Sequence, residues 1–299
     1  MNFADRLSAA VDTRESQIAL GLDPDPMRLL PEALDAAGRG SPAERSARAV
    51  ASHCRRVLEA AGEACVAVKL QLACFERLGA PGWKALLETA RMGRDAGLLV
   101  IADGKRGDVP HTAHAYAQSL VGSTTTPWGE VPGLGADAVT ASPILGRDAL
   151  DPIVDTARSA GAGTFVLVRT SNPGAGEIQD LPADGFPIHL KFAALVNELG
   201  AGGAGTCGLT DVGAVVAANS PELIQSLREA MPRAVFLLPG VGAQGGRVDR
   251  LGPAFAPGRA AAILTASRSI VDAAIEAGEA SAARVAAERL REAAWRTSG

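Results

Sequence analysis

This sequence predicts a single (β/α)8 barrel, because eight apolar runs of strand length recur along it with helix-like stretches between them. Strands that alternate with helices form right-handed βαβ units and a parallel sheet. Eight such units close the sheet into a barrel. The predicted strands are residues 18–23, 65–71, 98–103, 137–142, 164–170, 212–217, 234–239 and 261–266.

The whole chain, residues 1–299, is expected to form one barrel domain with an N-terminal helix before the first strand. No break in composition divides it, and the glycine-rich segment 200–208 is short enough to be the loop before the sixth strand. An open, doubly wound sheet is the alternative fold. It is less favoured because no GxGxxG motif follows the first strand.

Two of the predicted helices share a start signal. Ser41 is a candidate cap for a helix over residues 41–62, and Pro42 then takes the first helical position. Ser220 and Pro221 repeat this pattern ahead of another helix-like stretch. The pattern predicts where both helices begin.

The composition is that of an acidic globular protein, with 47% hydrophobic residues and a formal net charge of −4. Because it has no broad basic surface, nucleic acid is not expected to be a partner. The four cysteines show no CxxC spacing, which favours buried free thiols in the reducing cytoplasm. No segment has the pattern of a signal peptide or a membrane span, so no membrane partner is expected.

The most informative segment is 98–112, an apolar run that ends abruptly in charged residues. Side chains two apart on a strand share a face, so Asp103 and Lys105 should project together, and Asp108 could swing back toward them. The alternative is a surface hairpin, because Asp-Gly is a common turn pair. A hairpin is disfavoured because residues 109–120 look helical, with a proline near the start, rather than like a returning strand.

Lys69 lies on the predicted strand next to this one, and adjacent strands are about 4.8 Å apart. Lys69, Asp103, Lys105 and Asp108 could therefore form an array of alternating charge. A pair of unit charges about 4 Å apart is worth roughly 4 kcal/mol at an effective dielectric of 20, which keeps both members ionised. The alternative is a purely structural network of ion pairs at the barrel mouth.

Other polar residues gather where barrel enzymes keep their chemistry, at the carboxyl ends of the strands. Asp23 ends the first strand, Ser171 and Asn172 follow the fifth, and Arg268 follows the eighth. The loop 239–246, after the seventh strand, is rich in glycine, which lets backbone amides approach an anion closely. Together with Arg268, this loop predicts a phosphate site.

Two histidines follow the charged segment, at positions 111 and 114. They could suggest a metal site near Asp108. Without a clear carboxylate partner, however, two histidines three apart on a helix are more often packing or surface residues, so no metal is expected.

The sequence resembles the orotidine 5′-phosphate decarboxylases, in particular their longer bacterial subgroup. The DxKRxD element with Lys69 upstream is the most specific match, and the glycine-rich loop is less specific. The matching segments run in family order across nearly the whole chain. They are GLDPDP at 21–26, VKLQLACFERLGAPG at 68–82, DGKRGDVPHTAHAYA at 103–117, TSNPGA at 170–175, LPGVGAQGG at 238–246 and SRSI at 267–270.

The resemblance implies decarboxylation of orotidine 5′-monophosphate to UMP without cofactor or metal. By motif, Lys105 would donate the proton to C6 of the pyrimidine, and Asp103 would face the departing carboxylate. Lys69 would hold Asp103 and a ribose hydroxyl. The roles implied for binding are Asp23 on the ribose, Ser171 on the pyrimidine ring, and Gln244 and Arg268 on the phosphate.

The resemblance also implies a homodimer, in which Asp108 and Thr112 reach into the active site of the partner subunit. Two positions depart from the family pattern. Leu70 stands where proline is common, and Gly104 replaces the usual alanine. Neither departure removes a charged member of the array.

Three other functions stay open. One is a metal-dependent sugar-phosphate enzyme of the same barrel type, such as a keto-gulonate phosphate decarboxylase or a hexulose phosphate synthase, but those carry an acidic residue where this chain has Lys69. A Schiff-base aldolase is another, although flanking carboxylates hold a lysine protonated. The third is a nucleotide-binding protein without activity, against which the intact charge array argues.

Overall fold

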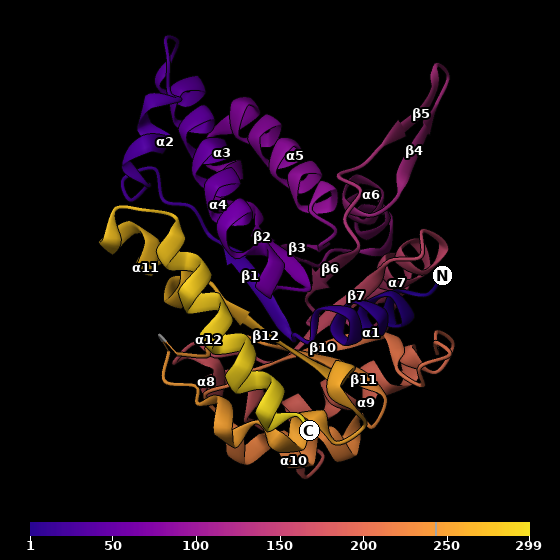
Figure 1. The fold of residues 1–299 in the computed structure, drawn as a ribbon. Helices are drawn as coiled ribbons and strands as arrows, with labels where there is room; N and C mark the ends of the chain where they lie inside the picture. The colour runs from indigo at the N-terminus through magenta and orange to yellow at the C-terminus, as the bar shows by residue number, and fades with distance from the viewer. Residues whose placement is uncertain (243) are drawn as a thin grey trace.

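The computed structural model describes residues 1–242 and 244–299, and it confirms the predicted barrel. Each of the eight predicted runs forms one barrel strand (Figure 1). The strands are β1 (Ile18–Leu22), β2 (Ala67–Gln71), β3 (Leu99–Arg106), β6 (Ala138–Ala141), β7 (Gly163–Arg169), β10 (Thr210–Val216), β11 (Ala234–Leu238) and β12 (Ala262–Ala266). They pair in parallel and close in the order β1-β12-β11-β10-β7-β6-β3-β2.

Helices surround the strands on the outside (Figure 1). The main helices are α1 (Phe3–Arg14), α2 (Pro31–Asp35), α3 (Pro42–Ala61), α4 (Leu72–Glu76), α5 (Gly79–Asp95), α6 (Pro110–Leu120), α7 (Arg147–Ser159), α8 (Ala175–Gln179), α9 (Ile188–Gly200), α10 (Pro221–Ala230), α11 (Arg268–Ala277) and α12 (Ser281–Thr297). Short 3-10 helices occupy Gly62–Ala64, Val248–Arg250, Gly252–Phe255 and Arg259–Ala261. Among the described helices, none is long and apolar enough to cross a membrane.

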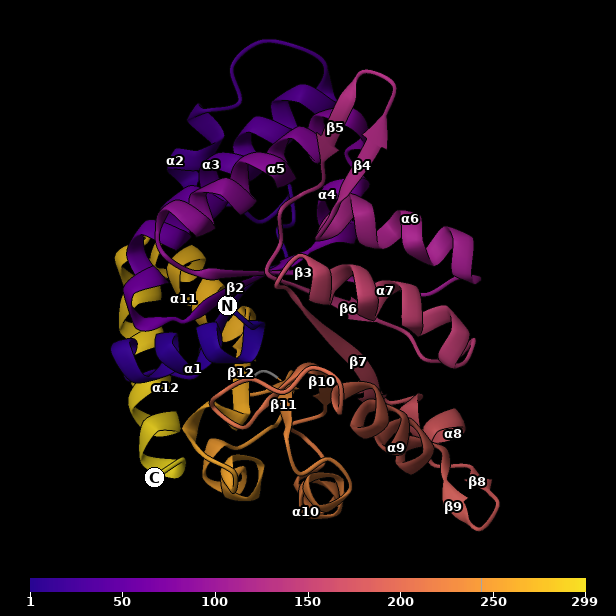
Figure 2. The same ribbon diagram turned by 90° about the vertical axis from the view of Figure 1, so that its right-hand side faces the viewer.

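Two antiparallel hairpins that the sequence pattern did not predict project from the barrel (Figure 2). One pairs β4 (Ser123–Thr126) with β5 (Gly129–Pro132), and most of its residues are exposed. The other pairs β8 (Pro182–Ala183) with β9 (Phe186–Pro187). Neither hairpin contributes a strand to the barrel.

The predicted helix starts are confirmed in one case and only partly in the other. At α3, Ser41 accepts a hydrogen bond from the Glu44 amide, the Glu44 carboxylate accepts one from the Ser41 amide, and Pro42 is the first helical residue. At α10, Pro221 is first as predicted, but Ser220 makes no side-chain capping bond. Ser220 has a ψ of 59° where Ser41 has 158°, so its hydroxyl lacks the extended backbone that capping needs.

The core has two parts, one inside the barrel and one between the strands and the helices. Phe165 belongs to the inner part, and the ring of Phe3 on α1 packs edge-on against it with centroids 5.7 Å apart. The predicted N-terminal helix therefore covers the end of the barrel where the strands begin. The opposite end, where the strands finish, is the end at which barrels of this type carry their active sites.

Side chains alternate between these two parts along each strand. On β2 and β3, Leu70 and Ala102 face the helices, whereas Ala67 and Ile101 face the interior. Lys69 lies two residues after Ala67, and Asp103 lies two residues after Ile101, so both follow the inward face. Strand periodicity thus directs the charged residues into the barrel rather than into solvent.

Candidate active site

A cavity of about 500 Å³ opens where the barrel strands end, and it gathers most of the predicted site residues. Asp108 and Thr112 are not among its lining residues. The predicted residues that do line it are Asp23, Lys69, Asp103, Lys105, Ser171, Gln244 and Arg268. One cavity therefore holds both the charged strand ends and the loop predicted to bind an anion.

The centre of the site is the carboxylate of Asp103, which lies between two lysines. The Lys69 ammonium is 2.7 Å from Oδ2, and the Lys105 ammonium is 2.7 Å from Oδ1. Lys69 also reaches Oδ1 of Asp23 at 3.4 Å. Lys69 and Asp103 are buried, but the Lys105 side chain is 43% exposed, so its ammonium is accessible from the cavity.

Mutual pairing keeps the buried charges ionised. Burial by itself would raise the pKa of Asp103, but the two neighbouring ammonium groups outweigh it and hold that pKa far below its usual range. Burial by itself would lower the pKa of Lys69, but Asp103 and then Asp23 outweigh it and raise that pKa above its usual range. Lys69 is therefore held protonated, which is the wrong state for the nucleophile of a Schiff-base aldolase.

Strand β3 continues through the charged motif to Arg106, so the alternative of a turn at Asp103 and Gly104 is wrong. Ala102 pairs with Val139 on β6, yet Arg106 pairs with Ala141, so three residues of β3 bulge opposite one residue of β6. Lys105 lies in this bulge with a φ of +47°. Left-handed backbone is uncommon outside glycine and is found at sites that the surrounding structure constrains.

Two polar residues that the sequence analysis missed complete the contacts of Asp103. Thr140 Oγ1 donates to Oδ1 at 2.9 Å, and Gln71 Nε2 donates to Oδ2 at 3.3 Å. Each carboxylate oxygen therefore accepts from one lysine and one neutral donor. The available signal was that both residues are polar and lie near the ends of apolar strand runs, at the level of Asp103.

With the two departures from the family pattern in place, both lysines contact Asp103. Leu70 packs among the helices, facing away from the cavity. A Cβ added at Gly104 would lie 2.7 Å from Leu72 Cδ1. Alanine at position 104 would thus require the flexible end of the Leu72 side chain to move.

The loop after β11 and the start of α11 form the side of the cavity predicted to bind phosphate. Gly240 has a φ of +95°, and a Cβ added to it would lie 3.0 Å from Gln244 Oε1, so glycine lets the Gln244 side chain fold over the loop. Arg268 is the first residue of α11, and a helix N-terminus favours an anion. Of the predicted glycine-rich loop, Ala243 lies outside the described residues.

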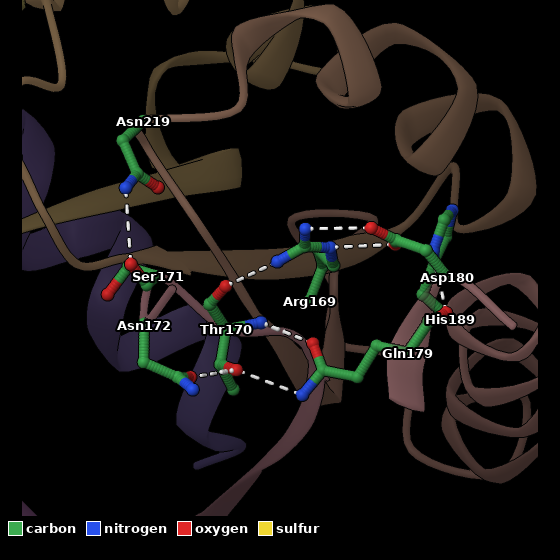
Figure 3. Close-up of polar contacts among 8 residues, drawn as sticks. All are labelled: Arg169, Thr170, Ser171, Asn172, Gln179, Asp180, His189 and Asn219. Atoms are coloured by element: carbon green, nitrogen blue, oxygen red, sulfur yellow. Dashed lines mark hydrogen bonds and ion pairs between the residues drawn. The ribbon is translucent and has the colours of Figure 1, made fainter. Parts of the chain in front are cut away.

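The loop that carries Ser171 is held by a network of polar contacts (Figure 3). Gln179 accepts from the Thr170 amide at 2.8 Å and donates to the Thr170 hydroxyl at 2.9 Å. Asn219 donates to the Ser171 carbonyl at 3.2 Å. Thr170, Asn172 and Gln179 line the cavity with Ser171, and of these three only Asn172 was predicted at this rim.

An ion pair behind this loop fixes α8 to the end of β7 (Figure 3). Arg169 contacts both carboxylate oxygens of Asp180 at 2.9 Å, and the Arg169 guanidinium lowers the pKa of that carboxyl group. His189 Nδ1 lies 3.0 Å from the same carboxylate. The Ser171 loop is therefore attached to the barrel on both sides.

Asp108 stays outside the charge array of its own chain. Its Oδ1 accepts a hydrogen bond from the Val109 amide, and among the described residues no ion pair joins it to Lys69 or Lys105. The chain enters α6 at Pro110, only two residues later. The backbone at Asp108 therefore leads directly into the helix, and the Asp108 side chain does not turn back to the array. Thr112, on the first turn of α6, is likewise partly exposed.

The two histidines of α6 also lie apart from the array. His111 is exposed, and His114 Nδ1 is 3.2 Å from the Thr156 hydroxyl on α7. Within the described part of the chain, no three His, Cys, Asp or Glu side chains are grouped as a metal site would require.

Comparison with known proteins agrees with this geometry. The sequence model of the Orotidine 5'-phosphate decarboxylase / HUMPS family matches residues 16–283. The orotidine 5'-phosphate decarboxylase of Rhodopirellula baltica is 42% identical over 91% of this chain and 88% of the relative, and that of Roseiflexus castenholzii is 38% identical over 98% and 97%. The solved structure of Leishmania donovani OMP decarboxylase superimposes with a TM-score of 0.76 at 29% identity, covering 100% of this chain and 99% of that one. This chain belongs to the orotidine 5′-phosphate decarboxylase / HUMPS family.

Proposed function

We propose that this protein decarboxylates orotidine 5′-monophosphate to UMP in pyrimidine biosynthesis, with its own side chains as the only catalytic groups. The relatives named above carry this activity in their names and match nearly the whole chain. The observation that carries the proposal is the charge array inside the cavity, in which Asp103 and Lys69 are buried and the ammonium of Lys105 is accessible.

The array suits this reaction because the difficult step makes a carbanion. When the bond between C6 and the carboxylate breaks, its electron pair stays on an sp2 carbon with little resonance stabilisation. A fixed ammonium group beside that carbon stabilises the charge without reorganising solvent. Lys105 fills this role, and it then passes one proton to C6 and regains it from water.

Asp103 and Lys69 prepare the site for this step. We assign Asp103 to face the departing carboxylate and Lys69 to hold Asp103 and a ribose hydroxyl. The support is that Lys69 contacts Asp103 and Asp23 together. Asp23 would then bind the ribose.

We assign the remaining roles to other residues that line the cavity. Ser171 would contact the pyrimidine ring, and Gln244 and Arg268 would hold the phosphate. Because the phosphate site lies away from the reacting carbon, its binding energy is available to close the loop after β11 over the substrate.

We further propose that the protein is a homodimer in which Asp108 and Thr112 complete the site of the partner subunit. In their own chain neither residue lines the cavity, which leaves both available for this role. We place the enzyme in the cytoplasm, since all four cysteines are free thiols, as a reducing compartment favours. Cys54 and Cys65 are buried as expected, but Cys74 is only partly buried and Cys207 is exposed.

The family also includes metal-dependent sugar-phosphate enzymes, so a second function must be weighed. Those enzymes carry an acidic residue where this chain has Lys69. Here that position holds an ammonium paired to two carboxylates, and a cation there would repel a metal ion rather than bind it. The geometry thus favours the decarboxylation of orotidine 5′-monophosphate.

The test is to mix the purified protein with orotidine 5′-monophosphate and follow the ultraviolet absorbance of the pyrimidine ring, with and without a chelator. We expect turnover to UMP at the same rate in both conditions. Absence of turnover, or turnover that the chelator abolishes and added Mg²⁺ restores, would refute the proposal. Parallel assays with 3-keto-gulonate 6-phosphate and with hexulose 6-phosphate should show no turnover.

A further inference from the structure

Thr140 occupies a position that no predicted role explains. It lies on β6 directly opposite the bulge of β3, since its neighbours Val139 and Ala141 pair with Ala102 and Arg106. Its side chain is directed into the barrel and lines the cavity, yet the residue is only 1% exposed. A buried hydroxyl in such a place needs hydrogen-bond partners.

The Thr140 hydroxyl has two partners in the catalytic array. It accepts from the backbone amide of Lys105 at 2.9 Å and donates to Oδ1 of Asp103 at 2.9 Å. The direction of both bonds is fixed by chemistry, because an amide can only donate and an ionised carboxylate can only accept. One hydroxyl therefore links the backbone of Lys105 to the carboxylate that its ammonium contacts.

The bulge explains why the Lys105 amide needs this partner. Regular pairing between β3 and β6 is interrupted from 103 to 105. The Lys105 amide therefore lies outside the regular series of main-chain hydrogen bonds in which a carbonyl of the neighbouring strand would accept from it. The hydroxyl of Thr140 takes the place of that carbonyl. It also helps to hold Lys105 at its left-handed φ of +47°, a conformation that persists only where the surroundings enforce it.

We infer that Thr140 is a positioning residue, which orients Lys105 through its backbone and Asp103 through Oδ1 without touching the substrate. This inference rests on the proposed function, because the reaction that it serves is proton donation by Lys105. It assigns the residue a role in the chemical step rather than in substrate binding.

The test compares Thr140→Val, which keeps the shape and removes the hydroxyl, with Thr140→Ser, which keeps the hydroxyl. In the valine variant we expect kcat to fall by about 100-fold while the KM for orotidine 5′-monophosphate and the Kd for UMP stay within about threefold, because the loss concerns geometry in the transition state. The serine variant should recover kcat to within about fivefold of the original chain.

The matched control is Thr164→Val on the neighbouring strand β7. Thr164 is equally buried, at 1% exposed, but its hydroxyl has no hydrogen-bond partner among the described residues. Its valine variant should keep the original kcat and KM. Thr140→Ala removes the same hydroxyl as Thr140→Val without adding an apolar group beside the carboxylate, and it should show the same loss of kcat, so the test does not depend on one variant folding well.

Three results would overturn the inference: an unchanged kcat in Thr140→Val or Thr140→Ala, a Thr140→Ser variant as slow as Thr140→Val, or UMP binding that weakens as much as kcat falls. The unmodified chain separates this inference from the proposed function. If that chain does not turn over orotidine 5′-monophosphate, the proposed function fails. If it is active and Thr140→Val is undiminished, only the role of Thr140 fails.

Discussion

The ammonium of Lys105 lies 2.7 Å from Oδ1 of Asp103, a residue only two positions earlier on the same strand. In regular strand geometry the two side chains would project side by side from one face. Here the bulge and the left-handed backbone of Lys105 accompany a direct contact between them. Lys105, the proposed proton donor, is therefore held against a carboxylate that Lys69 binds from the other side.

Replacing Asp103 by Asn should damage both catalysis and stability. The substitution removes the charge that balances buried Lys69, and breaking a buried ion pair in this way costs about 3–5 kcal/mol of the free energy of unfolding. We expect kcat to fall at least about 1,000-fold, because the orientation of Lys105 is lost as well. Urea denaturation and the absorbance assay measure the two effects.

The control is Asp184→Asn, which breaks an exposed ion pair with Lys191 at 3.0 Å. Exposed pairs contribute about 0–1 kcal/mol, so neither stability nor turnover should change noticeably. If Asp103→Asn behaved like Asp184→Asn, the catalytic array would have no functional importance.

Removing the phosphate from the substrate should lower turnover as well as affinity. If the binding energy of the phosphate closes the loop after β11, orotidine without phosphate should show a lower kcat and not only a higher KM. Arg268→Ala acting on the full substrate should reproduce part of both effects. Steady-state kinetics on the two substrates tests this, and a change confined to KM would contradict loop closure.

Buried His53 should make the protein less stable in acid. Its Nδ1 accepts a hydrogen bond from the Leu30 amide, and burial lowers the pKa of His53 from 6.5 to about 4. Between those pH values His53 is protonated in the unfolded chain but stays neutral in the folded chain. The free energy of unfolding therefore falls as the pH drops from 6.5 to 4, and His53 does not affect it above pH 6.5. The loss amounts to about 3 kcal/mol from this group.

Denaturant unfolding at a series of pH values checks this prediction. In His53→Asn, the side-chain oxygen can accept the hydrogen bond from the Leu30 amide in place of Nδ1, and the asparagine does not titrate. The stability of this variant should therefore decline less between pH 6.5 and pH 4. His111→Asn, at an exposed position, is the control and should leave the pH dependence unchanged. Identical curves for His53→Asn and the original chain would rule out this role.

If Asp108 completes the site of the partner subunit, mixing two inactive variants should restore activity. Lys105→Ala and Asp108→Ala chains that reassort at random form half mixed dimers, each with one intact site of two, so about a quarter of the original activity should return. Unfolding and refolding the two variants together, followed by the absorbance assay, measures it. No recovery in demonstrably mixed dimers would place Asp108 in its own subunit's site or outside any site.

Most of the barrel can be predicted because its signals are local. Strands of a parallel barrel are buried on both faces, so they read as continuous apolar runs, and all eight runs are strands in the structure. The start of α3 is local as well, since Ser41 and Glu44 form the capping box between themselves. The hairpin of β4 and β5 has no such signal, because its mostly exposed strands follow no apolar period.

The site is only partly predictable because some of its features depend on pairing between strands. The approach of Lys69 to Asp103 follows from two neighbouring inward-facing strands. The continuation of β3 to Arg106 does not, since polar residues usually end a strand and here they are paired inside a cavity. The contacts of Thr140 depend on the shifted register, which no local pattern encodes.

The most direct test of the whole account is the kcat of Lys105→Ala on orotidine 5′-monophosphate, measured together with its Kd for UMP. We expect a fall in kcat of at least about 10,000-fold with UMP binding retained within about tenfold, because Lys105 is proposed both to stabilise the carbanion and to supply the proton. A variant that keeps kcat within about tenfold of the original chain would show that the proton and the stabilisation come from elsewhere.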